Sequence, residues 1–168
     1  MKKLRYLAYG SNLHPIRLQK RVTSACFQGT VILSGWALQF HKRGQDGSAK
    51  CDIIKTYTGE STVYGALYAI AAAEKEYLDK AEGLGKGYER MAFHHLQYGR
   101  FFCYVATPSH IDNTLKPFAW YKEYVSQGAK YHDFPLDYIE KIEAVSSIAD
   151  DNRNRCKENQ KILAQMMK

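Results

Sequence analysis

Strand-like and helical patterns occupy different parts of this 168-residue chain. Alternating apolar residues and turn signals predict strands at 4–9, within 25–40, and at 52–55, 63–70, 88–97 and 101–106. A polar, glycine-containing loop is expected at 41–50. Apolar residues at helical spacing predict helices over 14–21, 71–82, 117–128, 136–145 and 152–168. Because most strands precede most helices, we expect an α+β fold in which a small mixed β-barrel is flanked by α-helices.

The chain has the length of one ordinary domain and contains no internal repeat or long Pro/Gly linker. We therefore expect one domain at residues 1–146 and a helical tail at 147–168. On that tail, Ile162, Leu163, Met166 and Met167 form a narrow apolar stripe. The stripe packs either on the tail's own domain or on a partner, so both a monomer and a homodimer agree with it.

The chain is basic, with 24 Lys and Arg residues against 17 Asp and Glu residues and a formal charge of +7. Its first 21 residues hold several cations and no acid; these are Lys2, Lys3, Arg5, Arg17, Lys20 and Arg21. A surface of this kind attracts small anionic substrates or nucleic acid, although a merely solvated basic face is the more common case.

The cysteines and the hydropathy pattern both indicate a cytoplasmic protein. The four cysteines lie far apart without a C-x-x-C pair, which argues against a zinc ribbon or a disulfide framework. No apolar run approaches the roughly 18 residues that a membrane-spanning helix needs. The turn at residues 9–12 also interrupts any signal-peptide core. We expect neither a membrane nor a secretory role.

The first candidate functional element is the turn Tyr9-Gly10-Ser11-Asn12, which ends the first predicted strand. Glycine permits a backbone conformation that other residues resist, and successive N–H groups in such a turn form a concave site for a carboxylate or oxyanion. Taken alone, the tetrapeptide is more often a structural turn.

The second candidate is Glu82, at the end of the predicted helix over 71–82. It follows Leu78 by four residues and so continues the apolar stripe, whereas Asp79 and Lys80 are expected to face water. The glycine at position 83 is typical of a helix C-terminal cap. A sheltered carboxyl group suits general acid–base chemistry, but spacing alone favours an ordinary glutamate at the domain rim.

Other patterns carry less chemistry. The segment 83–87 is rich in glycine, but it follows a helix and lacks the ending of a phosphate-binding loop. His94 and His95 are neighbours on a predicted strand, so their side chains point to opposite faces and cannot share a metal ion. We expect neither a metal site nor a cofactor.

Four motifs in order resemble the gamma-glutamylcyclotransferase family, in its bacterial type. They are Tyr6-Leu7-Ala8-Tyr9-Gly10-Ser11-Asn12-Leu13, Phe40-His41-Lys42-Arg43 with 46–48 and 50–52, Leu78-Asp79-Lys80-Ala81-Glu82-Gly83 with Gly87-Tyr88, and Trp120-Tyr121-Lys122 with Gly128-Ala129. The likeness runs from Arg5 to Val145, and the tail after Ser146 lies outside it.

The resemblance implies a small β-barrel with flanking helices and an enzyme that cyclises a γ-glutamyl group to 5-oxoproline. In that reaction the α-amine attacks its own γ-carbonyl, and an amino acid or amine is released. The resemblance assigns the general acid–base role to Glu82. It implies substrate contacts at Tyr6, Leu7, Ala8, Tyr9, Gly10, Ser11, Asn12 and Tyr121. Lys42, Arg43 and Lys50 are candidates for contact with the leaving group, because γ-glutamyl peptides carry carboxylates.

Two other functions stay open at this stage. The first is a module that binds γ-glutamyl compounds or carboxylates without catalysis, since fold does not fix function. The second is a nucleic-acid-binding protein, which the basic ends suggest but which the scattered tyrosines do not support. A small-molecule γ-glutamyl substrate, with no nucleic-acid partner, is the preferred prediction. The leaving group stays undetermined.

Overall fold

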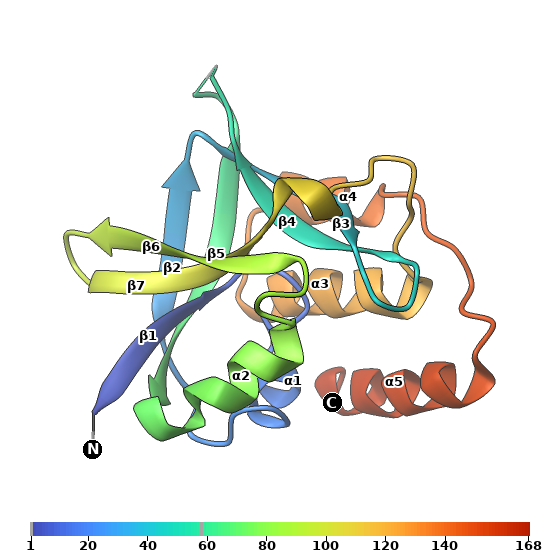
Figure 1. Ribbon diagram of the computed structural model, residues 1–168, viewed down its shortest axis with the longest axis horizontal. Coiled ribbons are helices and arrows are strands. Elements are labelled where there is room, and N and C mark those ends of the chain that lie inside the picture. The colour runs from blue at the N-terminus through green and yellow to red at the C-terminus, as the bar shows by residue number, and fades with distance from the viewer. Residues whose placement is uncertain (1, 58) are drawn as a thin grey trace.

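The computed structural model describes residues 2–57 and 59–168. Five strands form one mixed sheet in the order β2 (Cys26–Ser34), β5 (Thr62–Ala71), β1 (Lys3–Ala8), β7 (Gly99–Ala106) and β6 (Tyr88–His95) (Figure 1). A separate two-stranded sheet consists of β3 (Trp36–Arg43) and β4 (Ala49–Lys55).

Strand β1 lies at the centre of the larger sheet. It pairs antiparallel with β5 and parallel with β7, so the sheet is mixed as predicted. Leu7 and Ala8 at the end of β1 are fully buried, whereas Lys3 and Arg5 near its start are exposed. This central strand carries the turn at residues 9–12 to the edge of the core.

Side chains join the two sheets. The Asp52 carboxylate on β4 accepts a hydrogen bond from the backbone N–H of Ala106 on β7 at 2.7 Å. Its other oxygen lies 2.9 Å from Nε2 of His41 on β3. Among residues 2–57 and 59–168, no backbone ladder joins the sheets into a closed barrel. The α+β class, with a mixed sheet and flanking helices, is therefore confirmed.

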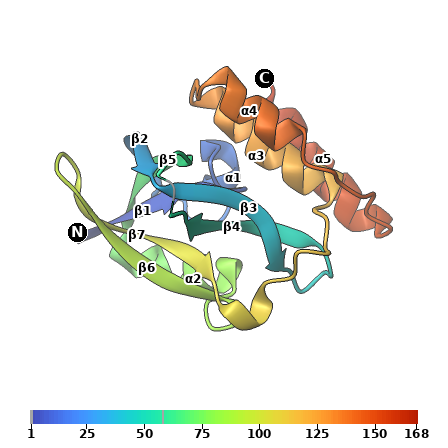
Figure 2. The same cartoon turned by 90° about the horizontal axis from the view of Figure 1, so that it is seen from above.

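The helices cover the strands on two sides (Figure 2). They are α1 (Pro15–Gln19), α2 (Lys75–Glu82), α3 (Ala119–Tyr131), α4 (Leu136–Glu143) and α5 (Arg153–Met166), with short 3₁₀ turns η1 (Ala72–Glu74) and η2 (Pro108–His110). Helix α3 packs between α4 and α5, and these three form a layer beside β3 and β4. In the part of the chain that the structure describes, no helix is long and apolar enough to cross a membrane.

Two sequence predictions were wrong in detail. Half of the predicted loop at 41–50 is strand, because β3 continues to Arg43 and β4 begins at Ala49. His41 and Lys42 are buried there, against Asp52 and the ring of Tyr88 respectively. The predicted helix over 71–82 begins as a 3₁₀ turn and becomes α-helical only at Lys75.

Helix α5 packs on α1 and α3. Leu163 and Met166 are buried beside Tyr124, whose hydroxyl donates to Oδ1 of Asn159 at 2.9 Å. Met167, predicted to belong to the same stripe, is 64% exposed. Just before α5, the Asp150 carboxylate accepts a hydrogen bond from Nε1 of Trp120 at 2.8 Å. These contacts tie the tail to the helix that carries Tyr121.

His14 makes stability depend on pH. It is 2% exposed, and its Nδ1 accepts the N–H of Ile16 at 3.2 Å, which caps α1. Burial, and then the charge of His132, lower the pKa of His14 to about 4. The unfolded chain therefore binds more protons between about pH 6.5 and pH 4. The contribution of His14 is complete above that window and is lost as the pH falls through it.

We expect the free energy of unfolding, measured with urea, to fall from pH 7 to pH 4.5 by an amount that includes about 2–3 kcal/mol from His14. His14→Asn keeps a capping side chain but does not titrate, so the fall should be smaller for this variant. An equal fall in both proteins would show that His14 does not titrate in this way.

Candidate active site

The turn after β1 and the end of α2 face a common cavity of about 20 Å³. Its lining residues are Tyr6, Tyr9, Gly10, Ser11, Asn12, Cys51, Glu82, Tyr88, Tyr104 and Tyr121. They come from β1 and its turn, β4, α2, β6, β7 and α3. The fold thus gathers one carboxyl group, one turn and five phenols from segments far apart in the sequence.

Glu82 reaches this cavity because α2 ends at that residue. Gly83 adopts a left-handed conformation with φ 73° and caps the helix, as the sequence predicts. Leu78, one turn earlier, is fully buried and fixes the face of α2 that packs on the sheet. Asp79 was predicted to face water, but its side chain is held by two partners instead. Its carboxylate accepts a hydrogen bond from the Tyr104 hydroxyl at 2.6 Å and forms an ion pair with Lys75. Lys80 is exposed as expected.

The Glu82 carboxylate has two partners on one oxygen. Its Oε1 accepts a hydrogen bond from Nδ2 of Asn12 at 2.7 Å and forms an ion pair with Arg21 at 2.5 Å. The Arg21 side chain is 21% exposed and that of Glu82 is 16% exposed, so the pair lies at the mouth of the cavity. A carboxylate held in this way has a defined position and one oxygen that binds neither partner.

The turn offers hydrogen-bonding groups beside this carboxylate. Its closing bond runs from the N–H of Leu13 to the carbonyl of Gly10 at 3.1 Å. Within residues 2–57 and 59–168, the N–H groups of Ser11 and Asn12 have no backbone acceptor. Oδ1 of Asn12 is also buried without a donor, because its amide nitrogen faces Glu82 and Tyr6. Ser11 and Asn12 line the cavity together with Glu82, so these two N–H groups and this oxygen are unused hydrogen-bonding groups near the carboxylate.

Close backbone packing holds the turn in place. A Cβ atom on Gly10 would lie 2.9 Å from Cβ of Cys51, and one on Gly128 would lie 2.4 Å from Cβ of Leu13. Both distances are shorter than side chains tolerate, so β4 and α3 approach the turn only because these residues are glycines.

The phenols of the cavity remain protonated. Burial raises the pKa of Tyr6, Tyr88 and Tyr121 well above the ordinary value, and the charge of Glu82 raises each of them further. The Tyr121 oxygen accepts a hydrogen bond from the backbone N–H of Cys51 at 2.9 Å. The Tyr88 hydroxyl donates a hydrogen bond to the backbone carbonyl of Cys51. Tyr121 therefore keeps its own O–H to offer to a ligand.

A larger cleft of about 290 Å³ adjoins the cavity and shares Ser11, Glu82, Tyr88 and Tyr121 with it. Its cationic lining residues are Arg17, Arg21, Lys42, Lys50, Lys80 and Lys86, against the acids Asp46 and Glu82. Lys50 pairs with Asp46 at 2.7 Å, and Arg21 pairs with Glu82. The other four cations form no ion pair with a described residue, so the cleft is electropositive.

Most of the predicted site residues meet at these two cavities. Glu82, Tyr6, Tyr9, Gly10, Ser11, Asn12 and Tyr121 line the smaller cavity, and Lys42 and Lys50 line the cleft. Three predicted residues do not reach them. Leu7 and Ala8 are buried in the core, and Arg43 forms an ion pair with Asp112 at 3.2 Å.

Sequence reasoning missed Arg21, Tyr88 and Tyr104 as members of the site. Arg21 stood out only as one of several early cations, and its contact with Glu82 joins residues 61 positions apart. Tyr88 belongs to one of the motifs that carry the resemblance, but no role was assigned to it there. The signal for Tyr104 was only the number of tyrosines, 13 in the chain.

Comparison with known proteins agrees with this arrangement. Residues 62–142 match the model of the AIG2-like family. This region belongs to the AIG2-like family. It includes β5, α2 with Glu82, β6, β7 and α3 with Tyr121. No curated protein sequence matches the chain.

The fold of the whole chain is that of gamma-glutamyl cyclotransferases. A solved structure described as a gamma-glutamyl cyclotransferase is 23% identical, with 98% of this chain and 99% of that chain covered at a TM-score of 0.79. A human protein described as uncharacterized protein loc79017 gives the same values. A yeast gamma-glutamyl cyclotransferase specific to glutathione is 12% identical, with 99% and 97% covered at a TM-score of 0.54. The family and fold predicted from the ordered motifs are confirmed.

Proposed function

We propose that this AIG2-like protein is a cytoplasmic gamma-glutamyl cyclotransferase that uses Glu82 as its general acid and base. The observation that carries the proposal is the position of Glu82 beside the turn at Ser11 and Asn12, whose N–H groups have no backbone acceptor in the described structure. A proton acceptor and a pair of oxyanion donors are the two functions that intramolecular attack of an amine on an amide requires.

The reaction begins with the α-ammonium group of a γ-glutamyl substrate. Glu82 removes one proton, and the nitrogen lone pair attacks the γ-carbonyl carbon. The carbonyl oxygen becomes an oxyanion, which the N–H groups of Ser11 and Asn12 stabilise. Oδ1 of Asn12, buried without a donor, is available to accept an N–H of the attacking amine.

Collapse of this intermediate breaks the bond to the leaving nitrogen. Glu82 returns its proton to that nitrogen, and the new ring nitrogen loses a second proton to the departing amine. The products are 5-oxoproline and a protonated amine, so atoms and charges balance. Because both reacting groups belong to one substrate, the main task of the site is to hold them in the reacting geometry.

The charge of the adjoining cleft favours one class of leaving group. Arg17, Lys42, Lys80 and Lys86 line it without ion-pair partners among the described residues. Burial lowers the pKa of Lys42, and its ammonium lies 4.5 Å from the centre of the Tyr88 ring. A carboxylate in the leaving group would neutralise these cations, whereas a polyamine would add charge of the same sign. We therefore propose γ-glutamyl amino acids or peptides as substrates.

The test is a panel of substrates that share the γ-glutamyl group and differ in the leaving group. It comprises a γ-glutamyl amino acid, glutathione, the matching γ-glutamyl amino acid amide and a γ-glutamyl polyamine, with 5-oxoproline measured directly. We expect kcat/KM to be at least ten-fold higher for the carboxylate-bearing members. Turnover of the polyamine alone would overturn the proposed leaving group, and no 5-oxoproline from any member would overturn the activity.

In this proposal Arg21 binds the substrate. A cavity of about 20 Å³ holds no γ-glutamyl group, and Arg21 lies at its mouth, paired with Oε1 of Glu82. Substrate therefore has to displace this guanidinium, which then binds a substrate carboxylate. We expect Arg21→Ala to raise KM at least ten-fold while kcat stays within a few-fold, and Arg21→Lys to recover part of KM. A fall in kcat at constant KM would contradict this role.

One observation favours the alternative of a binding module without catalysis. Oε1 of Glu82 is held by both Arg21 and Asn12, and this arrangement also suits a carboxylate that only anchors a ligand. Calorimetry with the same panel separates the two functions, because saturable binding without 5-oxoproline is the result that a binding module gives.

A further inference from the structure

A second cavity lies away from the candidate active site, between β1 and β7. These two strands share a single register pair, Tyr6 with Phe102, whereas β1 and β5 share six pairs. The strands diverge toward Lys3 on β1 and Gly99 on β7, and a cavity of about 780 Å³ opens there. Its lining has no residue in common with the two cavities around Glu82. We call it the β1–β7 groove.

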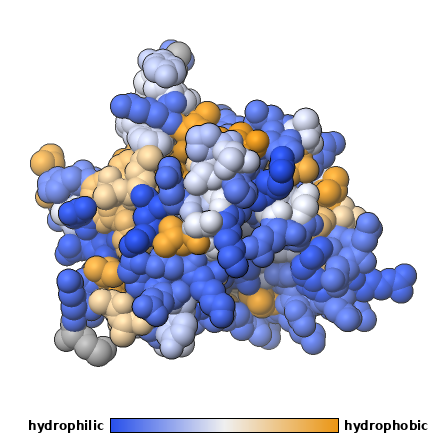
Figure 3. Space-filling model, viewed as in Figure 1, coloured by the Kyte–Doolittle hydropathy of each residue, from blue (hydrophilic) through white to orange (hydrophobic). Residues whose placement is uncertain are grey.

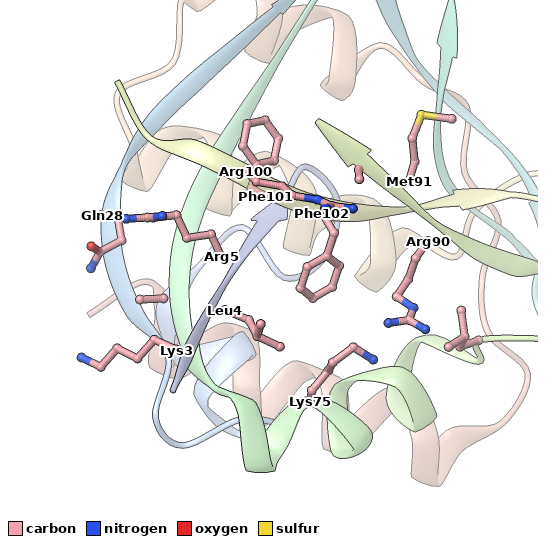
Figure 4. Close-up of a pocket in the computed structure, with 13 residues that line it drawn as sticks. Lys3, Leu4, Arg5, Gln28, Lys75, Arg90, Met91, Arg100, Phe101 and Phe102 are labelled. Atoms are coloured by element: carbon pink, nitrogen blue, oxygen red, sulfur yellow. The ribbon is translucent and has the colours of Figure 1, made fainter. Parts of the chain in front are cut away.

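The groove has an apolar floor between cations. The half-buried side chains of Leu4 and Phe102 point into the space, with Arg5 on one side and Arg90 and Lys75 on the other (Figure 4). On the molecular surface, this side of the protein shows apolar patches among strongly hydrophilic atoms (Figure 3). A ligand with a flat apolar body fits such a floor.

The charges of the groove are of one sign. Its lining includes Lys3, Arg5, Lys75, Arg90 and Arg100, and no acidic residue. Lys75 is neutralised by Asp79. In the described structure the other four cations form no salt bridge, although like charges gathered at one groove repel one another. An anionic ligand would remove that repulsion.

Three of these four cations are arginines. The guanidinium group presents a planar fork of donors that matches phosphate oxygens in pairs, and it is the preferred residue for phosphate recognition. A volume of about 780 Å³ lies within the range of about 300–1,000 Å³ that small-molecule sites occupy. A ligand that matches both the arginines and the apolar floor carries phosphate groups and a flat ring in one small molecule, and a nucleotide has both.

We propose that the β1–β7 groove binds a nucleoside polyphosphate, with the base on Leu4 and Phe102 and the phosphates on Arg90 and Arg100. The site is independent of Glu82 and of the proposed reaction. Among polyanions, a single nucleotide fits better than a nucleic-acid strand, because the β6–β7 hairpin and α2 bound the groove on two sides (Figure 4).

The test is isothermal titration calorimetry of the full chain at about 0.15 M salt with four probes: ATP, adenosine, inorganic triphosphate and a short oligothymidylate. We expect ATP to bind with a stoichiometry of one. Arg90→Gln combined with Arg100→Gln should weaken ATP binding at least ten-fold. Phe102→Leu should weaken ATP but leave triphosphate unchanged, because it alters only the floor.

Two controls identify the location. Arg153→Gln removes an exposed arginine of α5 outside the groove and should leave ATP binding unchanged. Glu82→Gln should also leave it unchanged, because Glu82 lies in another cavity. Thermal unfolding of each variant verifies that it folds.

Four results would overturn the proposal. They are no saturable ATP binding at millimolar concentration, equal weakening by Arg153→Gln, triphosphate binding as tight as ATP, and tighter binding of the oligothymidylate with a steep dependence on salt. The last of these would identify a strand-binding surface instead.

Discussion

Replacing Glu82 with glutamine is expected to reduce the rate of 5-oxoproline formation by about 10²–10⁴-fold. Glutamine keeps the size of the side chain and still accepts a hydrogen bond at the position where Glu82 meets Asn12 and Arg21. It does not take a proton from the α-ammonium group, so kcat should fall while KM changes little. The measurement is steady-state release of 5-oxoproline from a γ-glutamyl amino acid.

The matched control is Glu76→Gln, an exposed glutamate on the same helix. It makes the same chemical change without touching the cavity, so its rate should equal that of the wild type. If Glu82→Gln also reacts at the wild-type rate, Glu82 is not the general base and the proposed mechanism fails.

The largest expected loss of stability follows removal of the Asp52 carboxylate. Asp52 is 2% exposed. One of its carboxylate oxygens accepts a hydrogen bond from the backbone N–H of Ala106 at 2.7 Å, and the other lies 2.9 Å from Nε2 of His41. Asp52→Ala leaves both groups buried without a partner. Breaking a buried pair of this kind costs about 3–5 kcal/mol, and we expect the free energy of unfolding in urea to fall by that amount.

Asp151→Ala serves as the control, because Asp151 is exposed and should change stability by no more than about 0.5 kcal/mol. A loss below about 1 kcal/mol in Asp52→Ala would mean that the β3–β4 hairpin is held to the large sheet by other contacts.

Local signals predicted much of the fold. The turn at residues 9–12, the end of α2 at Glu82 and its Gly83 cap are all set by residues within one helical turn or one strand end. Such features depend on the backbone preferences of a few neighbours, which the sequence displays directly.

Long-range contacts explain the parts that the sequence did not predict. His41 and Lys42 look like loop residues, yet β3 continues through them because Asp52 and the Tyr88 ring give their polar groups buried partners. Asp79 looks solvent-facing on a helical wheel, yet the hydroxyl of Tyr104, on a strand formed later in the chain, binds it. In each case the partner is distant in sequence, so no local pattern reports it.

In the proposed reaction, the pairing of Arg21 with Glu82 predicts two opposed responses to ionic strength. Dissolved ions weaken a partly solvated ion pair, and both members of this one are partly exposed. A higher salt concentration therefore separates the Glu82 carboxylate from Arg21 more often in the substrate-free protein. It also screens the attraction between the cationic cleft and an anionic substrate. The first effect favours the chemical step and the second hinders capture, so turnover at saturating substrate and efficiency at trace substrate should diverge as salt rises.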